Sequence, residues 1–233
     1  MLIPRLSLKK RKIEAFNLKL RPSEGTSTGG FSIIVCHPQE ENNSVASSYI
    51  PTQGTIQTRV QETANGSGNS EVFNDSQGIL YANISTDSED TYKYISINNG
   101  TSTGNQTRVA LGYYGSTLYP NVRVSNAHQF SEAFSINPTL NNKIALKYKT
   151  NDFALWVNGF EVLESNSGST FSDGTLSKFD FDDGASSSDF YGSTKEIGYY
   201  DTVLTDEELE TLTSYRTWEE MVKELNLNII HNE

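Results

Sequence analysis

The stretch that decides the fold is IALKYKTNDFALWVNGFEVLE, residues 144–164, because it reads as two β-hairpins in succession. Apolar side chains recur at every second position over 144–149 and again over 153–157, which is the period of a half-buried strand. Asn158-Gly159 then supplies the dipeptide that best adopts positive φ at both centres of a type I′ turn. The pattern predicts an antiparallel β-meander, and such sheets carry binding faces more often than buried catalytic machinery.

Short strand signals recur on both sides of this stretch, separated by turns rich in Gly, Asn and Ser. They lie at 14–20, 31–36, 79–84, 92–97, 107–114, 121–124, 129–136, 179–181 and 194–200. Many short strands with almost no helix between them predict an all-β fold, an antiparallel β-sandwich or jelly roll. Capping-box signatures at 205–208 and 217–220 predict two short helices that close the chain.

Composition divides the chain into four segments. Residues 1–21 form a basic N-terminal arm, with seven Lys and Arg residues against Glu14 alone. Residues 22–65 contain strands and are interpreted as an arm or as the remnant of a preceding sandwich. Residues 66–213 are the main jelly roll, and 214–233 are a C-terminal helix and tail. The Gly-, Asn- and Ser-rich passage that begins at residue 65 marks the main boundary, although such a passage can equally be a loop inside one domain.

Charge and composition exclude several classes of function. The chain carries a net charge of −11 despite its basic arm, and an acidic body repels nucleic acid, so we expect no nucleic-acid partner. No stretch approaches the roughly 18 apolar residues of a membrane span, and the N-terminus lacks the apolar segment of a signal peptide. Cys36 is the only cysteine, which excludes an intrachain disulfide and a CxxC metal site.

Three motifs resemble known families. FALWVNG at 153–159 and YYDTVLTDEELE at 199–210 resemble the hairpin and the closing strand and helix of concanavalin A-like, laminin-G-type jelly rolls. SYIPTQG at 48–54, followed by Thr58-Arg59, resembles a segment that recurs in bacteriophage tail-fibre and related virion proteins. The resemblance implies a concanavalin A-like jelly roll in a virion structural protein.

That resemblance also implies a function. The chain would be a tail fibre, head fibre or decoration protein whose lectin-like jelly roll recognises host-surface glycans. Other virion proteins would bind the N-terminal arm, the subunit would form homo-oligomers, and the location would be the virion, extracellular after release. A bacterial carbohydrate-binding lectin or adhesin domain is the alternative, and a glycoside hydrolase is the least favoured class.

Glycoside hydrolysis requires a pair of carboxylates. Retaining glucanases need two of them about 5 Å apart across the scissile bond. The resemblance to the concanavalin A-like fold implies that its retaining glucanases would carry them in a string E-x-D-x-x-E on one strand, and this chain lacks that string. Glu161 and Glu164 have odd spacing on an extended strand, so we expect them to face opposite sides of the sheet. The sequence therefore predicts no catalytic residues and no enzyme.

Candidate glycan-binding residues are aromatic side chains that can stack on a sugar ring and polar ones that can bond its hydroxyls. They are Tyr113, Tyr114, Tyr119, Arg123 and Trp156. Tyr92 and Tyr94 share one face of a predicted strand.

Calcium is the only cofactor that the sequence leaves open. Asp180, Asp182 and Asp183 could supply hard oxygen ligands in a loop. The Asp-Asp-Gly sequence also forms turns without any metal.

Overall fold

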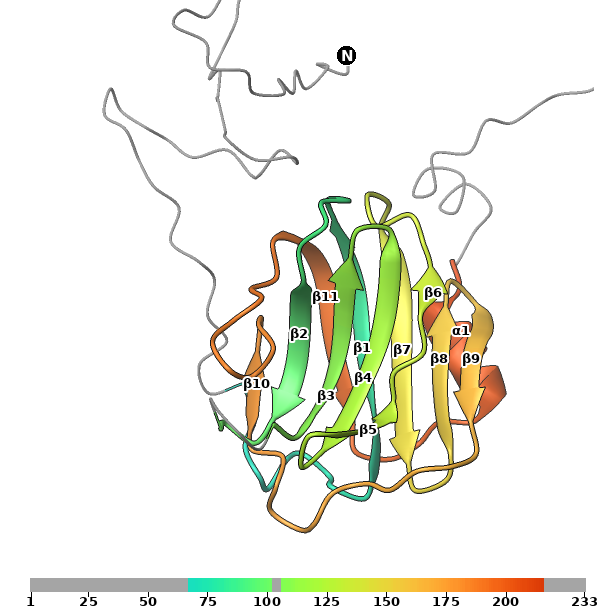
Figure 1. Cartoon of the computed structure of the whole chain (residues 1–233). Helices are drawn as coiled ribbons and strands as arrows, with labels where there is room; N and C mark the ends of the chain where they lie inside the picture. Colours follow the sequence, from blue (N-terminus) through green and yellow to red (C-terminus); the bar gives the residue numbers. More distant parts are fainter. Residues whose placement is uncertain (1–66, 102–105, 216–233) are drawn as a thin grey trace, which may run out of the picture. The chain divides into compact units, whose positions relative to one another are not determined.

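The computed structural model describes residues 67–101 and 106–215 (Figure 1). The predicted segments 1–21 and 22–65 and the predicted helix from 217 lie outside the described residues, and these parts of the domain division stay predictions. The predicted jelly roll at 66–213 contains every strand and helix of the described part.

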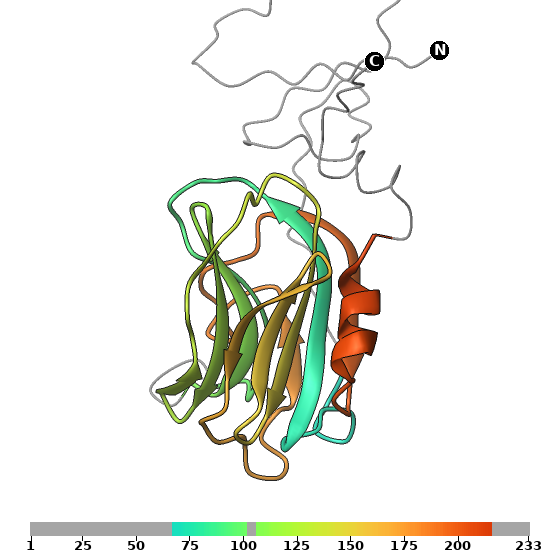
Figure 2. The same ribbon diagram turned by 90° about the vertical axis from the view of Figure 1, so that its right-hand side faces the viewer.

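Two antiparallel sheets face each other (Figures 1 and 2). The five-stranded sheet has the order β11 (Gly192–Tyr200), β1 (Gln77–Thr86), β7 (Asn142–Lys149), β8 (Phe153–Val157) and β9 (Phe160–Ser165). The six-stranded sheet has the order β10 (Lys178–Asp180), β2 (Lys93–Asn98), β3 (Arg108–Tyr114), β4 (Thr117–Val124) and β5 (Ala127–Phe130), and β6 (Phe134–Ser135) also pairs with β4. The predicted all-β sandwich is confirmed.

The two hairpins of residues 144–164 form as predicted. Strands β7, β8 and β9 pair in sequence, and Asn158 and Gly159 have φ values of 51° and 91°, as a type I′ turn requires. These features could be predicted because the turn type and the strand pattern depend only on residues that are close along the chain.

One predicted strand is wrong, and another is too short. The segment 129–136 forms β5 and β6, which pair with opposite ends of β4. Strand β4 begins at Thr117 rather than at 121, so it includes Pro120, a residue type that is unusual inside a strand. Pro120 is tolerated because it lies between the positions that pair with β6 and those that pair with β5, where its missing N–H costs no ladder bond.

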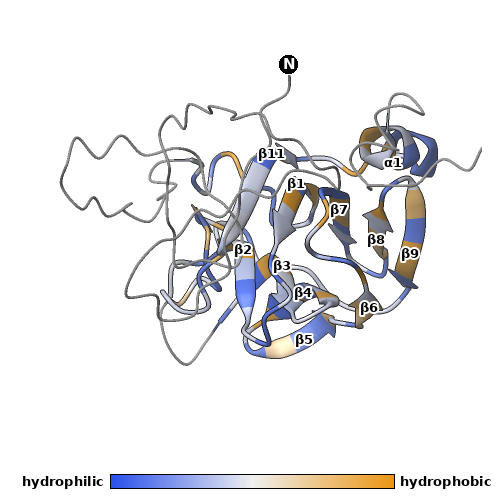
Figure 3. Cartoon of the chain, turned by 90° about the horizontal axis from the view of Figure 1, so that it is seen from above, coloured by the Kyte–Doolittle hydropathy of each residue, from blue (hydrophilic) through white to orange (hydrophobic). Residues whose placement is uncertain are grey.

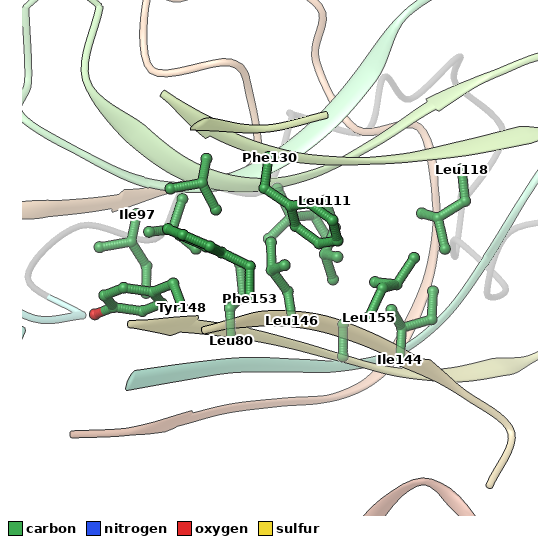
Figure 4. Packing of buried hydrophobic residues seen from close by; sticks show 14 of the residues in the cluster. Leu80, Ile97, Leu111, Leu118, Phe130, Ile144, Leu146, Tyr148, Phe153 and Leu155 are labelled. Carbon is green, nitrogen blue, oxygen red and sulfur yellow. The ribbon is translucent and has the colours of Figure 1, made fainter. Parts of the chain in front are cut away.

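The hydrophobic core lies between the two sheets. Figure 4 shows side chains such as Leu80 and Leu146 from the five-stranded sheet pointing toward Leu111 and Phe130 from the six-stranded sheet. Each of these side chains is almost completely buried, and burying one contributes roughly 1.5–3 kcal/mol. The inward positions use every second residue, so the alternate residues of each strand face away from the core.

A β-bulge overturns the expected orientation of Glu161 and Glu164. The register shifts between β8 and β9, so Trp156 lies opposite Glu161 whereas Ala154 lies opposite Glu164. The bulge adds one residue to β9 and restores both glutamates to the same face. The prediction that they face opposite ways is therefore wrong, because residue spacing alone does not reveal a bulge.

The helix α1 (Asp206–Thr213) covers the outer face of the five-stranded sheet (Figure 2). The predicted capping box is present: the Thr205 side chain accepts from the Glu208 N–H, and the Glu208 carboxylate accepts from the Thr205 N–H. Leu209 is buried in a cluster with Trp156 and Ile79. Within the described residues no helix is long and apolar enough to cross a membrane.

Candidate functional site

In the described part of the chain, no helix covers the outer face of the six-stranded sheet. This face carries polar and aromatic side chains. Figure 3 shows hydrophilic segments on β2, β4 and β5. Strand register places one side chain from each of five neighbouring strands in a single line across this face, and four of the five are basic. This line, called the basic row, consists of Lys178, Asn98, Arg108, Arg123 and His128.

Arg108 is the buried centre of the basic row. Its side chain is held by Asn121, whose Oδ1 accepts from Nε at 3.0 Å, and by Asp183, whose carbonyl accepts from Nη1. The Asp183 carboxylate lies 3.6 Å away, and the guanidinium lies 4.9 Å from the centre of the Tyr94 ring. Burial lowers the pKa of Arg108, and Tyr94 and Asp183 oppose that shift. Arg108 therefore ties the sheet to the loop that carries Asp183.

Arg123 is half-buried and has a different set of partners. Its Nε donates to the carbonyl of Asn126 at 3.1 Å, and its Nη1 donates to Oε1 of Gln106 at 2.9 Å. Both acceptors are neutral, and no carboxylate of the described residues lies within ion-pair distance of Arg123. His128 lies opposite Arg123 on β5, and its pKa is lowered by burial and by the charges of Arg123 and Arg108. This end of the face therefore carries a positive charge that no carboxylate of the described residues neutralises.

We predict that the Arg123→Gln substitution raises the pKa of His128. Removing the neighbouring guanidinium removes a charge that disfavours the protonated imidazole, so the proton is held to higher pH. NMR titration of the His128 ring measures this directly, with His128→Gln used to assign the signal. Lys178→Gln is the matched control, because Lys178 is paired with Asp180 at 2.9 Å and belongs to the far end of the row. An unchanged or lowered His128 pKa in Arg123→Gln would contradict the prediction.

A tyrosine cluster lies at the other end of the face. The ring of Tyr92 is stacked on that of Tyr94 at 6.0 Å between centroids, and it lies 4.7 Å from that of Tyr114. Tyr92 is 51% exposed and Tyr114 is 37% exposed, so both present ring surface to solvent. The name tyrosine cluster is used below for Tyr92, Tyr94 and Tyr114.

Gly112 makes room for this cluster. A Cβ on Gly112 would lie 2.2 Å from Cε1 of Tyr94, which no side chain can accommodate without moving the ring. Tyr94, Gly112 and Tyr119 are cross-strand neighbours, so the two tyrosines flank the glycine on the outer face.

The structure brings three of the five predicted glycan-binding residues together. Tyr114, Tyr119 and Arg123 lie on the outer face of the six-stranded sheet. Tyr113 is fully buried in the core, because adjacent residues of an extended strand face opposite sides, and burial raises the pKa of its hydroxyl. Trp156 is buried on the other sheet beside Leu209 of α1. Neither Tyr113 nor Trp156 is placed to stack on a sugar.

Sequence reasoning missed five residues of this face, namely Asn98, Arg108, Asn121, His128 and Lys178. The signal that could have found the first three is strand alternation, since each follows or precedes a core residue such as Ile97 or Val122. Their alignment into one row depends on register, which the sequence does not show.

The three aspartates proposed for calcium do not converge. Asp180 accepts from Asn98 Nδ2 at 3.0 Å, Asp182 from the Gly184 N–H at 2.6 Å and Asp183 from the Ala185 N–H at 2.9 Å. The described residues contain no group of three His, Cys, Asp or Glu side chains that could hold a metal ion. The alternative interpretation, in which these aspartates stabilise turns, accounts for their contacts.

Glu161 and Glu164 share the outer face of the five-stranded sheet, on the side of α1. Burial, Asp206 and Glu164 raise the pKa of Glu161. Like charges gathered at a strand edge also discourage pairing with another strand. Nothing in this arrangement assigns a catalytic role.

Comparisons with known proteins bear on the fold. No protein-family model matches the chain, and no curated protein matches its sequence. Among solved structures, the CBM40 module of the Ruminococcus gnavus IT-sialidase, bound to alpha2,3 sialyllactose, has a TM-score of 0.50 and 19% identity over 60% of this chain and 84% of its own.

Two further solved structures are less similar. Sheep galectin-11 has a TM-score of 0.38 and 9% identity over 53% of this chain and 89% of its own. A pentraxin of Limulus polyphemus has a TM-score of 0.40 and 12% identity over 59% of this chain and 70% of its own. The likeness to the CBM40 module concerns the fold alone, and the described domain is a jelly-roll β-sandwich of two antiparallel sheets.

Proposed function

We propose that this domain is a non-enzymatic carbohydrate-binding domain and that the outer face of the six-stranded sheet is its glycan-binding surface. The observation that carries the proposal is the presence, on one face, of exposed tyrosine rings beside a line of hydrogen-bond donors. Rings that are apolar on the face and polar at the hydroxyl suit a sugar, which has apolar C–H faces and a polar rim. The shared fold with a module solved with a sugar bound agrees with this proposal.

In this proposal, one end of the face stacks on a sugar ring, and the other end forms hydrogen bonds with sugar hydroxyls. A pyranose ring stacks on the exposed part of Tyr92 or Tyr114. Its hydroxyls, or those of the next sugar, bond to Tyr119 and Arg123, which follow along β4. Arg108 and Asn121 are buried and bonded to one another, so they hold the floor of the surface in place.

The test of this proposal is Tyr114→Ala in the full-length chain. We expect about a tenfold loss of glycan affinity, as for a typical aromatic hot spot. Glycan-array screening finds the ligand, and isothermal titration calorimetry measures the affinity. Tyr200→Ala is the matched control, because Tyr200 is 36% exposed but lies on the five-stranded sheet. Equal losses in the two variants, or no glycan binding by the parent chain, would refute the proposal.

The wider proposal places the protein on a bacteriophage particle, as a tail fibre, head fibre or decoration protein. Its support is the resemblance of SYIPTQG to segments of virion proteins. The basic arm would dock on other virion proteins, and repetition of homo-oligomers on the particle would make weak glycan sites effective. Mass spectrometry of purified virions should detect the chain. If the chain is monomeric, binds glycans and is absent from virions, the result would instead support the alternative function, a bacterial lectin or adhesin domain.

A further inference from the structure

The charges of the basic row are unevenly compensated. Lys178 pairs with Asp180 at 2.9 Å, and Arg108 pairs with Asp183 at 3.6 Å. Both aspartates belong to β10 or to the loop that follows it. Arg123 has no carboxylate partner among the described residues, and His128 beside it is held toward its neutral form. The β10 side of the face is therefore neutralised, and the β4–β5 side is not.

This imbalance is unusual for an acidic chain. The net charge is −11, so a half-buried arginine without a carboxylate neighbour does not follow from the overall composition. Two buried lysines elsewhere have carboxylate partners: Lys147 pairs with Asp152 at 2.6 Å, and Lys93 pairs with Asp87 at 2.7 Å. A charge that the fold leaves uncompensated at a ligand surface is available to an anion from outside.

The guanidinium of Arg123 is also held in position. Nε donates to the carbonyl of Asn126 in the β4–β5 turn, and Nη1 donates to Oε1 of Gln106, which lies just before β3. These two bonds orient the planar group. Nη2 has no hydrogen-bond partner in the described part of the chain. An arginine fixed by neutral acceptors loses little conformational entropy when its free donors bind a carboxylate or sulfate.

We infer that the glycan recognised by this domain is acidic, and that Arg123, with His128 opposite, binds its carboxylate or sulfate group. The inference rests on the proposed function and names its substrate class. Tyr119, Asn121 and Arg123 lie on one face of β4, so this strand leads from the tyrosine cluster to the anion end. One glycan can then stack on the tyrosines while its charged group lies over Arg123.

The experiment is an array that displays the same glycan backbones in neutral, carboxylated and sulfated forms, probed with the full-length chain. We expect binding to at least one acidic form about tenfold tighter than to its neutral counterpart, since a charge-assisted bond to Arg is among the stronger hydrogen bonds. In Arg123→Gln that preference should disappear, because affinity for the acidic form falls about tenfold further than affinity for the neutral form, whose hydroxyls Arg123 also bonds. Carboxylated and sulfated forms of one backbone show which anion is bound.

Lys149→Gln is the matched control for net charge. Lys149 is an exposed cation at the end of β7, so its loss removes the same charge from the other sheet and leaves the outer face of the six-stranded sheet unchanged. Equal affinity for acidic and neutral forms in the parent chain overturns the inference but leaves glycan binding intact. An equal loss of acid preference in Lys149→Gln also overturns it, since the effect would then be general attraction. Failure to bind any form refutes the proposed function itself.

Discussion

The Phe153→Ala variant is expected to lose about 3–5 kcal/mol of unfolding free energy, because it leaves a cavity where the two sheets meet. The Phe153 side chain is buried, and its ring lies 6.0 Å from that of Phe130 on the opposite sheet (Figure 4). It also packs on Gly168, where an added Cβ would lie 2.8 Å from its Cε2. Phe130 and Gly168 come from separate segments of the chain, so no single shift can fill the space.

Phe160→Ala is the matched control within the same hairpin. Phe160 is 72% exposed, so its removal should change the unfolding free energy by no more than about 0.5 kcal/mol. Urea unfolding followed by fluorescence gives both values, and equal m-values show that the same surface unfolds. Similar losses in the two variants would mean that the inward orientation of Phe153 is wrong.

Replacing Arg108 with methionine should cost about 3 kcal/mol, because the Asp183 carboxylate then loses its buried partner. Methionine keeps most of the side-chain volume, so the loss reports the charge and the hydrogen bonds rather than a cavity. Asn121 and the Asp183 carbonyl both lose a donor as well. Adding Asp183→Asn should recover part of the loss, since it removes the carboxylate that the first change leaves unpaired.

Arg123→Met is the control for this change, because Arg123 is half-buried and bonds only neutral oxygens. It should cost no more than about 1 kcal/mol. Denaturant unfolding measures the totals, and amide hydrogen exchange over 181–190 should speed up only in Arg108→Met, as the loop loses its tie to the sheet. Unchanged exchange in that loop would show that Arg108 does not hold it.

The predicted glycan-binding residues show what the alternation of side chains along a strand can and cannot predict. Tyr113 and Tyr114 are consecutive tyrosines, and alternation requires that one faces the core while the other faces solvent. Which one does so depends on where the second sheet lies, so both entered the prediction and only Tyr114 reached the outer face. Trp156 entered it as an aromatic beside a turn, and the helix that covers it comes from about fifty residues further along the chain.

The sequence by itself determined most strands of the described part, the type I′ turn at Asn158-Gly159 and the capped helix, because each depends on residues that are close along the chain. The tertiary structure alone decided the bulge that turns Glu161 and Glu164 to one face. It also aligned side chains from Asn98 to Lys178 into one row. The physical reason is that antiparallel pairing joins residues far apart in sequence, and their register depends on packing between two sheets.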